Sequence, residues 1–152
     1  MLDRSPTQQA TIWLHSFSEA LACGDVAAAS ALFLDECYWR DLLTFTWNIR
    51  TMEGRNAIEA MLSATLARTK PSVWQISGEA TRDGDTVEAW FTFETAVARG
   101  EGILRLKDGR CRTILTAMRE LKGHEEKCGR RRALGVRHEA DPNRETWLEA
   151  RR

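Results

Sequence analysis

Residues 37–47, CYWRDLLTFTW, place a single carboxylate among aromatic side chains. Asp41 lies between Trp39 and Trp47 in this stretch. A carboxylate in poorly solvated surroundings is a candidate general acid or base for proton transfer. The alternative is structural, because backbone amides of residues 42–50 or the two indole N–H groups can hydrogen-bond the carboxylate. The residues alone leave both interpretations of Asp41 open.

Apolar periodicity predicts the elements that position this stretch. Helical spacing predicts three helices, over residues 7–23, 26–34 and 54–68. Alternation predicts a strand over residues 36–42, in which Cys37, Trp39 and Asp41 share one face. The segment 43–54 is less regular, and no element is predicted there.

From Val73 onward the apolar pattern changes to a period of two, which predicts strands. Turn signals at Asp83-Gly84 and Asp108-Gly109 divide the region into a four-strand antiparallel meander. Helices followed by strands predict an α+β fold, in which three helices cover one face of a curved antiparallel sheet. The expected domain spans residues 1–121, and residues 122–152 form a charged C-terminal extension.

Composition limits the class of protein. The 152 residues are 43% hydrophobic and carry 22 basic and 22 acidic side chains, which is typical of one soluble globular domain. The absence of a signal peptide and of an apolar run near 18 residues predicts a cytoplasmic protein with no membrane partner. The basic run Arg130–Arg132 lacks interleaved aromatic residues, so nucleic-acid binding is not expected.

Cysteine and histidine spacing gives no metal site. The four cysteines have no paired spacing, which predicts reduced thiols. His124, Cys128 and His138 lie in the extension without the paired spacing of metal ligands, so no bound metal is expected.

Three stretches resemble the NTF2-like superfamily, which includes ketosteroid isomerase, the SnoaL polyketide cyclases and scytalone dehydratase. They are ALACGDVAAASALF (20–33), CYWRD (37–41) and EGRNAIEAML (53–62). With the meander, the resemblance covers residues 7–121. It implies a cone-shaped half-barrel whose curved antiparallel sheet is covered on its concave side by three helices. It also implies a pocket between sheet and helices, and frequent dimerisation.

The same resemblance implies a role for Asp41. Ketosteroid isomerases place a general-base aspartate sixteen residues after the aspartate of a Gly-Asp pair, which here is Gly24-Asp25 and leads to Asp41. Their oxyanion donors correspond to Phe17 and to a position near Gly102, and neither residue carries a side-chain donor. Ketosteroid isomerase chemistry is therefore not expected. A SnoaL-like cyclase, isomerase or dehydratase with Asp41 as general acid or base remains the alternative.

A closer resemblance covers nearly the whole chain. YWRDLLTFTWNIRTMEGRNAI, VEAWFTFET, LKGHEEKCGRRRALGVRH and TWLEARR look like the N-terminal NTF2-like region of bacterial and fungal flavin-containing monooxygenases. In those proteins the TWLE segment leads into the dinucleotide-binding domain. The resemblance implies an accessory domain, as a fragment or as one part of a split protein. The flavin fingerprint G-x-G-x-x-G lacks its third glycine at residues 100–105, so no flavin or other cofactor is expected in this chain.

Aromatic residues supply the expected binding surfaces. We expect a ligand pocket to be lined by Trp13, Phe17, Trp39, Trp47, Phe91, Phe93 and Met118. Trp90 lies on the polar side of its strand, which predicts a contact with a homodimer partner or a flavin monooxygenase module. The sequence predicts a domain that binds a hydrophobic small molecule and docks on a partner. The alternative is a stand-alone enzyme that acts on a hydrophobic carbonyl compound.

Overall fold

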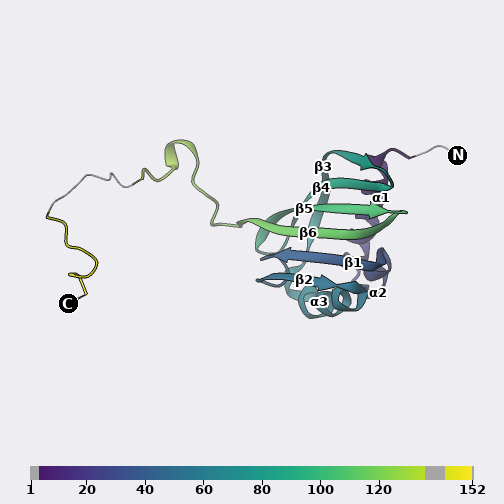
Figure 1. Cartoon of the computed structure of the whole chain (residues 1–152), viewed down its shortest axis with the longest axis horizontal. Coiled ribbons are helices and arrows are strands. Elements are labelled where there is room, and N and C mark those ends of the chain that lie inside the picture. The colour runs from purple at the N-terminus through teal and green to yellow at the C-terminus, as the bar shows by residue number, and fades with distance from the viewer. Residues whose placement is uncertain (1–3, 136–142, 152) are drawn as a thin grey trace.

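The computed structural model describes residues 4–135 and 143–151, and within them the helices and strands follow one another as expected for an α+β chain (Figure 1). In chain order they are α1 (Pro6–Ala22), α2 (Val26–Ala31), β1 (Phe33–Leu42), β2 (Ile49–Glu53), α3 (Gly54–Thr69), β3 (Ser72–Asp83), β4 (Thr86–Glu94), β5 (Ala98–Lys107), β6 (Arg110–Leu121) and a short 3-10 helix, η1 (Gly129–Arg131). None of the described helices is long and apolar enough to cross a membrane.

The six strands form one curved sheet in the order β2-β1-β6-β5-β4-β3. Strands β3 to β6 make the antiparallel meander that the turn signals predicted. The expectation of a wholly antiparallel sheet is wrong, because β1 pairs with β6 in parallel. The chain crosses from β2 through α3 to the far edge of the sheet, and the meander then returns so that its last strand lies beside β1. The result is the open α+β half-barrel expected from the sequence.

Two expected boundaries near β1 need correction. The second helix ends at Ala31 rather than at residue 34, because Phe33 is already a fully buried residue of β1. The irregular segment 43–54 contains a strand, β2, which pairs with β1 in antiparallel register. Met52 is the single buried residue of β2, so this strand carries no apolar alternation by which it could be recognised.

The helices cover one face of the sheet. α1 begins at a capping box in which Ser5 and Gln8 bond each other's backbone N–H groups. It packs on β3 and β4, whereas α3 packs on β1 and β2. The buried face of α1 carries Ala10, Trp13, Leu14, Phe17 and Leu21. These side chains meet the inner face of the sheet, and together they form the hydrophobic core.

Two glycines of β5 allow unusually close packing in this core. The rings of Phe91 and Phe93 lie over Gly102 and Gly100, their partners in the β4–β5 register. A Cβ atom at Gly102 would lie 2.1 Å from the carbonyl oxygen of Leu115 and 2.4 Å from Cζ of Phe91. The aromatic inner face of β4 therefore depends on the absence of side chains at these positions.

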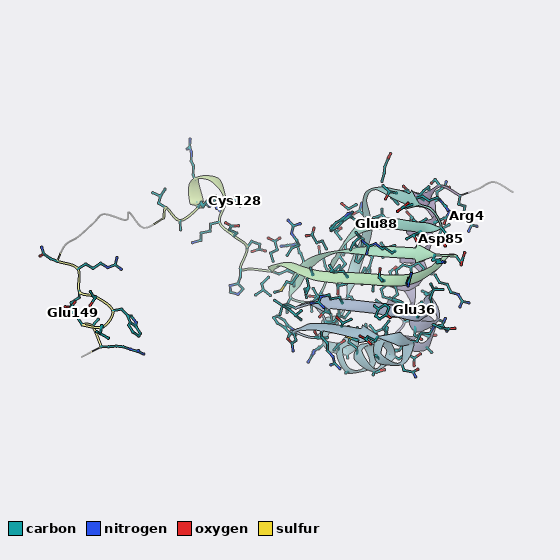
Figure 2. All side chains as sticks on the ribbon, in the orientation of Figure 1. Arg4, Glu36, Asp85, Glu88, Cys128 and Glu149 are labelled. Atoms are coloured by element: carbon teal, nitrogen blue, oxygen red, sulfur yellow. The ribbon has the colours of Figure 1, made fainter. Side chains whose placement is uncertain are left out.

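After β6 the chain runs away from the sheet (Figure 1). Figure 2 shows Cys128 and Glu149 on this extension, far from Glu36 and Glu88 on the domain. Its described large apolar side chains are exposed, with 97% at Leu134, 70% at Trp147 and 63% at Leu148.

Candidate functional site

Asp41 lies on the inner face of β1 with 0% exposure. Its Oδ2 atom accepts hydrogen bonds from the backbone N–H groups of Phe45 (3.0 Å) and Thr46 (2.8 Å). The Thr46 hydroxyl also donates to Oδ2, at 2.9 Å. The Oδ1 atom accepts from the hydroxyl groups of Thr116 (2.7 Å) and Thr44. Backbone amides of the 42–50 segment thus hydrogen-bond Asp41, which is the arrangement that the structural interpretation of this residue requires.

The carboxylate organises the loop between β1 and β2. Five donors converge on its two oxygens, which offer about four lone-pair sites. The loop contains two non-glycine residues with positive φ, Leu43 (66°) and Trp47 (55°), a conformation that bulky side chains seldom adopt. Hydrogen bonds to a fixed acceptor hold the backbone in this tight path. The geometry suits a buried loop anchor better than a group that exchanges protons with a substrate.

Trp39 extends this network across the sheet. Its Nε1–H donates to the Thr116 hydroxyl at 2.9 Å, and that hydroxyl donates to Asp41. The indole therefore contacts the carboxylate through Thr116 and not directly. Thr116 lies on β6 in the parallel register opposite Asp41, so the β1–β6 pairing brings the two residues together. No local pattern in the sequence indicates this contact, because the two residues are far apart along the chain.

The residues expected to line a pocket differ in burial. Five of them are buried and belong to one aromatic core: Trp13, Phe17, Trp39, Phe91 and Phe93. Met118, on β6 opposite Gly100, is partly buried. Trp47 is 51% exposed on the β1–β2 loop, away from the core cluster.

The core also contains aromatic residues that the sequence interpretation did not select. Phe33, Phe45 and Trp74 contact the expected pocket residues at ring-centroid distances between 4.7 and 6.2 Å. Trp74 and Ile76 are one alternation step apart in β3 and both pack against the core, so the period-two pattern offered a signal for Trp74.

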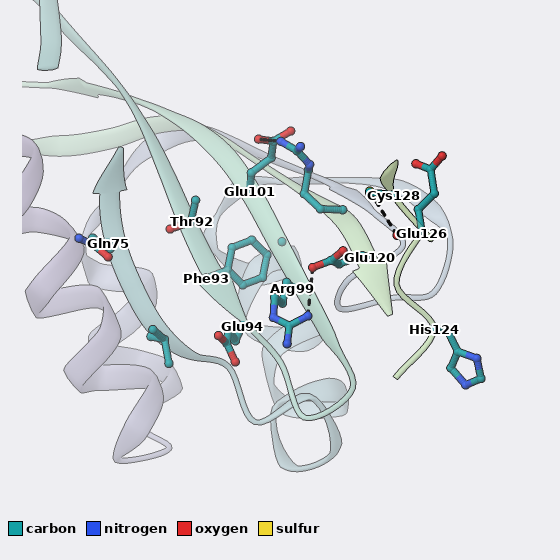
Figure 3. A pocket seen from close by; sticks show the side chains of 13 residues that line it. Gln75, Thr92, Phe93, Glu94, Arg99, Glu101, Glu120, His124, Glu126 and Cys128 are labelled. Atoms are coloured by element: carbon teal, nitrogen blue, oxygen red, sulfur yellow. Dashed lines mark hydrogen bonds and ion pairs between the residues drawn. The ribbon is translucent and has the colours of Figure 1, made fainter. Parts of the chain in front are cut away.

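A large hollow lies elsewhere, beside the point at which the extension leaves the sheet (Figure 3). It measures about 760 Å³, and its wall includes Val73, Phe93, Arg99, Glu101, Arg119, His124 and Cys128. The charges around it are paired with one another. Arg99 contacts Glu120 and Glu125, each at 3.0 Å, and Arg119 contacts Glu101 at 2.5 Å.

These contacts do not assemble a metal centre within the described part of the chain. His124 and Cys128 line the hollow, and His138 lies outside the described residues. All four cysteines are free thiols. Burial raises the pKa of Cys37 and raises that of Cys111 well above its ordinary value, so neither is suited to act as a thiolate nucleophile.

Glu125 connects the start of the extension to the domain through its contact with Arg99. Its lowered pKa predicts how this contact depends on pH. The backbone N–H groups of Gly123 and of Glu125 itself, together with the Arg99 side chain, lower the pKa of Glu125 from 4.5 to about 2. Because the folded pKa is depressed, this attachment is complete above pH 4.5 and is lost as the pH falls through about 2. A carbon-detected NMR titration of the Glu125 carboxyl should give that low midpoint.

An Arg99→Met variant provides the comparison. The midpoint should rise only in part, because the two backbone donors remain. A wild-type midpoint at 4.5 would contradict the contact between Glu125 and the Gly123 backbone.

The face of the sheet opposite the helices carries an outer apolar band, defined as Leu42, Ile49, Trp90, Ile103, Leu115 and Ala117. Trp90 pairs with Ile103, which pairs in turn with Leu115, so these side chains lie in one row. Leu42 pairs with Ile49 and Ala117 in the next row. Trp90 is 51% exposed, and the helices lie on the opposite face.

Ion pairs border this band. Glu88 and Arg105 lie 2.7 Å apart, and Glu101 and Arg119 lie 2.5 Å apart across neighbouring strands. These charges satisfy each other within one chain. A partner that covers the outer apolar band would therefore meet these paired charges, and it would also meet Arg40, which lies beside Leu115 in the register and donates a hydrogen bond to Thr51.

Comparisons with known proteins agree with this architecture. The sequence profile of the SnoaL-like domain matches residues 14–114. Among curated protein sequences, none matches this chain significantly.

Solved structures give fold-level likenesses. A ketosteroid isomerase-like protein from Erwinia carotovora atroseptica superposes with a TM-score of 0.62 at 8% identity, covering 75% of this chain and 96% of that one. An NTF2-like protein with a cystatin-like fold from Novosphingobium aromaticivorans gives 0.57 at 16% identity, covering 73% and 80%. A Mycobacterium tuberculosis protein in complex with estradiol-17beta-hemisuccinate gives 0.55 at 15% identity, covering 74% and 93%.

Proposed function

The chain belongs to the SnoaL-like domain family. We propose that it is a non-catalytic member of this family whose function is to bind other protein chains. It forms a homodimer through the outer apolar band and acts as an accessory domain of a flavin-containing monooxygenase, without binding flavin itself. The observation that carries this proposal is the band itself: six apolar side chains in two rows on a sheet face that none of the described helices covers.

The chemistry of the band favours a second copy of the chain as its first partner. A half-exposed tryptophan beside aliphatic side chains is the composition of an interface core. The Glu88–Arg105 and Glu101–Arg119 pairs supply the surrounding polar rim. An isologous contact needs a patch that is complementary to itself, and an apolar band with internally paired charges meets that condition.

The extension supplies the second contact, with the monooxygenase module. Thr146 and Glu149 bond each other's backbone N–H groups in the pattern of a capping box, and residues 147–151 form a turn. Trp147 and Leu148 follow the cap and are mostly exposed. A turn that presents two apolar side chains is suited to dock on an apolar groove of another module. The resemblance of TWLEARR to the segment preceding a dinucleotide-binding domain supports a flavoprotein as that partner.

The environment of the Asp41 carboxylate argues against the alternative that the chain is an enzyme. Its carboxylate is fully buried and accepts five hydrogen bonds from its own chain. A general base needs an oxygen within hydrogen-bond reach of the substrate proton. A substrate would have to displace the donors that hold the β1–β2 loop before it reached this oxygen. We therefore assign Asp41 a structural role.

A Trp90→Glu substitution tests the association. A charge in the middle of the band should convert a dimer of twice 17.3 kDa into a monomer, because a desolvated and unpaired carboxylate cannot enter an apolar contact. Sedimentation equilibrium measures the mass directly. Ile12→Glu is the matched control, since Ile12 is also exposed but lies on α1, away from the band. The control should remain dimeric.

The same samples test the second contact. Wild-type chain mixed with a flavin-containing monooxygenase module should co-elute with the yellow flavoprotein in size-exclusion chromatography. A Trp147→Ala, Leu148→Ala double variant should elute apart from it while remaining dimeric. A wild-type chain that stays monomeric at all concentrations and never co-elutes with the flavoprotein would overturn the proposal.

A further inference from the structure

The two edges of the sheet are packed differently. At one edge, β3 shifts its register against β4 between residues 72 and 75 and again between residues 77 and 81, and α1 packs on it. At the other edge, the short strand β2 has α3 beside it (Figure 1). A groove of about 290 Å³ lies there, with walls from β2, α3 and the β1–β2 loop. None of the residues that line it belongs to the outer apolar band.

The groove carries positive charge, and its wall contains no acidic side chain. Arg50 lines it from β2, and Arg68 lines it from the last turn of α3. Neither arginine forms an ion pair within the described residues, whereas Arg99 and Arg105 of β5 each pair with a glutamate. Two unpaired guanidinium groups beside one groove attract an anion.

The buried carboxylate of Asp41 does not neutralise this pair of arginines directly. Arg50 lies opposite Asp41 in the β1–β2 register. The carboxylate nevertheless accepts its five hydrogen bonds from other groups and forms no ion pair with the guanidinium of Arg50. The N–H groups of Arg50 therefore remain free to bond a ligand.

The guanidinium of Arg68 is already positioned by the β1–β2 loop. Its Nη2 atom donates a hydrogen bond to the carbonyl oxygen of Phe45 at 3.3 Å, and the N–H group of Phe45 bonds Asp41. The remaining N–H groups of this guanidinium are free to donate to a ligand. A side chain that is oriented before binding loses less conformational entropy when the ligand arrives.

The floor of the groove is apolar. Ala57, Ala60 and Ala64 follow one another at three- and four-residue spacing, so they share one face of α3, and Met61 is buried beside them. Small side chains on this face leave the groove open. Its volume is close to the lower limit of small-molecule sites, roughly 300 Å³, and suits one aromatic ring or a short aliphatic chain.

We propose that this groove binds a small organic phosphate monoester, whose phosphoryl group bridges Arg50 and Arg68 while its organic part lies on the alanine floor. One guanidinium group can satisfy both oxygens of a carboxylate, but a phosphoryl group has three terminal oxygens and can bond two guanidinium groups at once. Its charge of about −2 at pH 7 also matches two arginines. The inference is independent of the association proposed above.

Two probes of matched shape test the head group. Phenyl phosphate and phenyl sulfate share the ring and a tetrahedral group with three terminal oxygens, but the sulfate carries a single negative charge. The wild-type protein should bind phenyl phosphate about ten-fold more tightly, the ratio expected for one further charge-assisted contact. An NMR titration that follows the Nε–H resonances of Arg50 and Arg68 gives both affinities and locates the site.

Substitutions of the two arginines test their roles. Arg50→Gln and Arg68→Gln should each weaken phenyl phosphate binding about ten-fold and remove most of the preference over phenyl sulfate. Arg50 makes no side-chain contact of its own in the free protein, so its variant reports on the ligand alone. Arg82→Gln is the matched control, because Arg82 is also exposed and lies on β3 at the far edge of the sheet. The control should bind as the wild type does.

A second pair of variants tests the floor of the groove without changing charge. Ala64→Leu places a longer side chain in the groove and should abolish phenyl phosphate binding. Ala67→Leu lies on the same helix and is also exposed, but residue 67 does not line the groove, so binding should be unchanged.

The outcomes separate this site from the proposed association. A wild-type chain that stays monomeric and prefers phenyl phosphate would overturn the association and leave this site standing. A dimer that binds neither probe would overturn the site and leave the association standing. Equal affinities for the two probes, or an Arg82→Gln variant that loses as much affinity as Arg50→Gln, would also overturn the site.

Discussion

Replacing Asp41 with asparagine is expected to lower the free energy of unfolding by about 2–4 kcal/mol. The carboxylate accepts two backbone N–H groups and the hydroxyls of Thr44, Thr46 and Thr116. An asparagine side chain keeps one acceptor oxygen. Its NH2 group is a donor, so it cannot accept the hydrogen bonds that the second carboxylate oxygen accepts. Whichever way the amide points, buried donors of the β1–β2 loop lose their acceptor, and each such loss is costly.

Urea unfolding followed by circular dichroism measures this change. Asp108→Asn is the matched control, because Asp108 lies in an exposed turn with a φ of 50°, which asparagine adopts equally well. The control should unfold within about 0.5 kcal/mol of the wild type. An Asp41→Asn variant as stable as the control would show that the network contributes nothing to folding.

The prediction for Asp41 also bears on activity measurements. Loss of turnover on substitution of a buried aspartate is ordinarily taken as a sign of catalysis. Here the same loss would follow from release of the β1–β2 loop. A Thr44→Val, Thr46→Val double variant separates the two explanations, because it removes two hydroxyl donors of the loop and leaves the carboxylate in place. If Asp41 acts on a substrate, turnover in this variant should persist; if the loss comes from release of the loop, turnover should fall as it does in Asp41→Asn.

Gly102→Ala is expected to destabilise the protein by about 3 kcal/mol or more, the upper end of the range for overpacked cores. The added methyl group would lie 2.1 Å from the Leu115 carbonyl oxygen, which is backbone and cannot rotate away. It would also lie 2.4 Å from the Phe91 ring. Relief of these contacts requires β5 and β6 to separate, and that weakens the ladder between them.

Thermal unfolding of three variants distinguishes this cause from a general intolerance of alanine. Gly135→Ala should melt as the wild type does, because nothing lies within 4 Å of a Cβ atom there. Gly100→Ala should fall between the two, since its closest contact is the Phe93 ring at 2.5 Å and the nearest backbone oxygen is 3.0 Å away. A Gly102→Ala variant that melts with Gly135→Ala would contradict the close packing of β4, β5 and β6.

The sequence was sufficient for the parts of the fold that carry a strong apolar period. The stripe of α1, the alternation of β4 and the two Asp-Gly turns gave the helices and the meander. The inward placement of Trp39 and Asp41 also followed from alternation, and both residues are 0% exposed. These features depend on residues close together in the sequence, so the pattern of residue types predicts them.

The remaining features depend on contacts between distant segments. β2 buries one residue in five, and its existence depends on pairing with β1. The environment of Asp41 depends on Thr116 from the far end of the chain. Trp47 resembled a pocket residue by composition, yet its backbone has a φ of 55° in a loop that leaves the indole half exposed. Such placements are set by tertiary structure, which periodicity does not encode.

The irregularities of β3 have a consequence for aggregation. A long, flat edge strand offers its free N–H and C=O groups as a template for strands of other molecules, and fibres can grow from it. Here one edge, β2, is five residues long, and the other, β3, is interrupted twice along its register. Neither edge presents a continuous template. Strand addition by other chains at the rim of the sheet is thereby disfavoured.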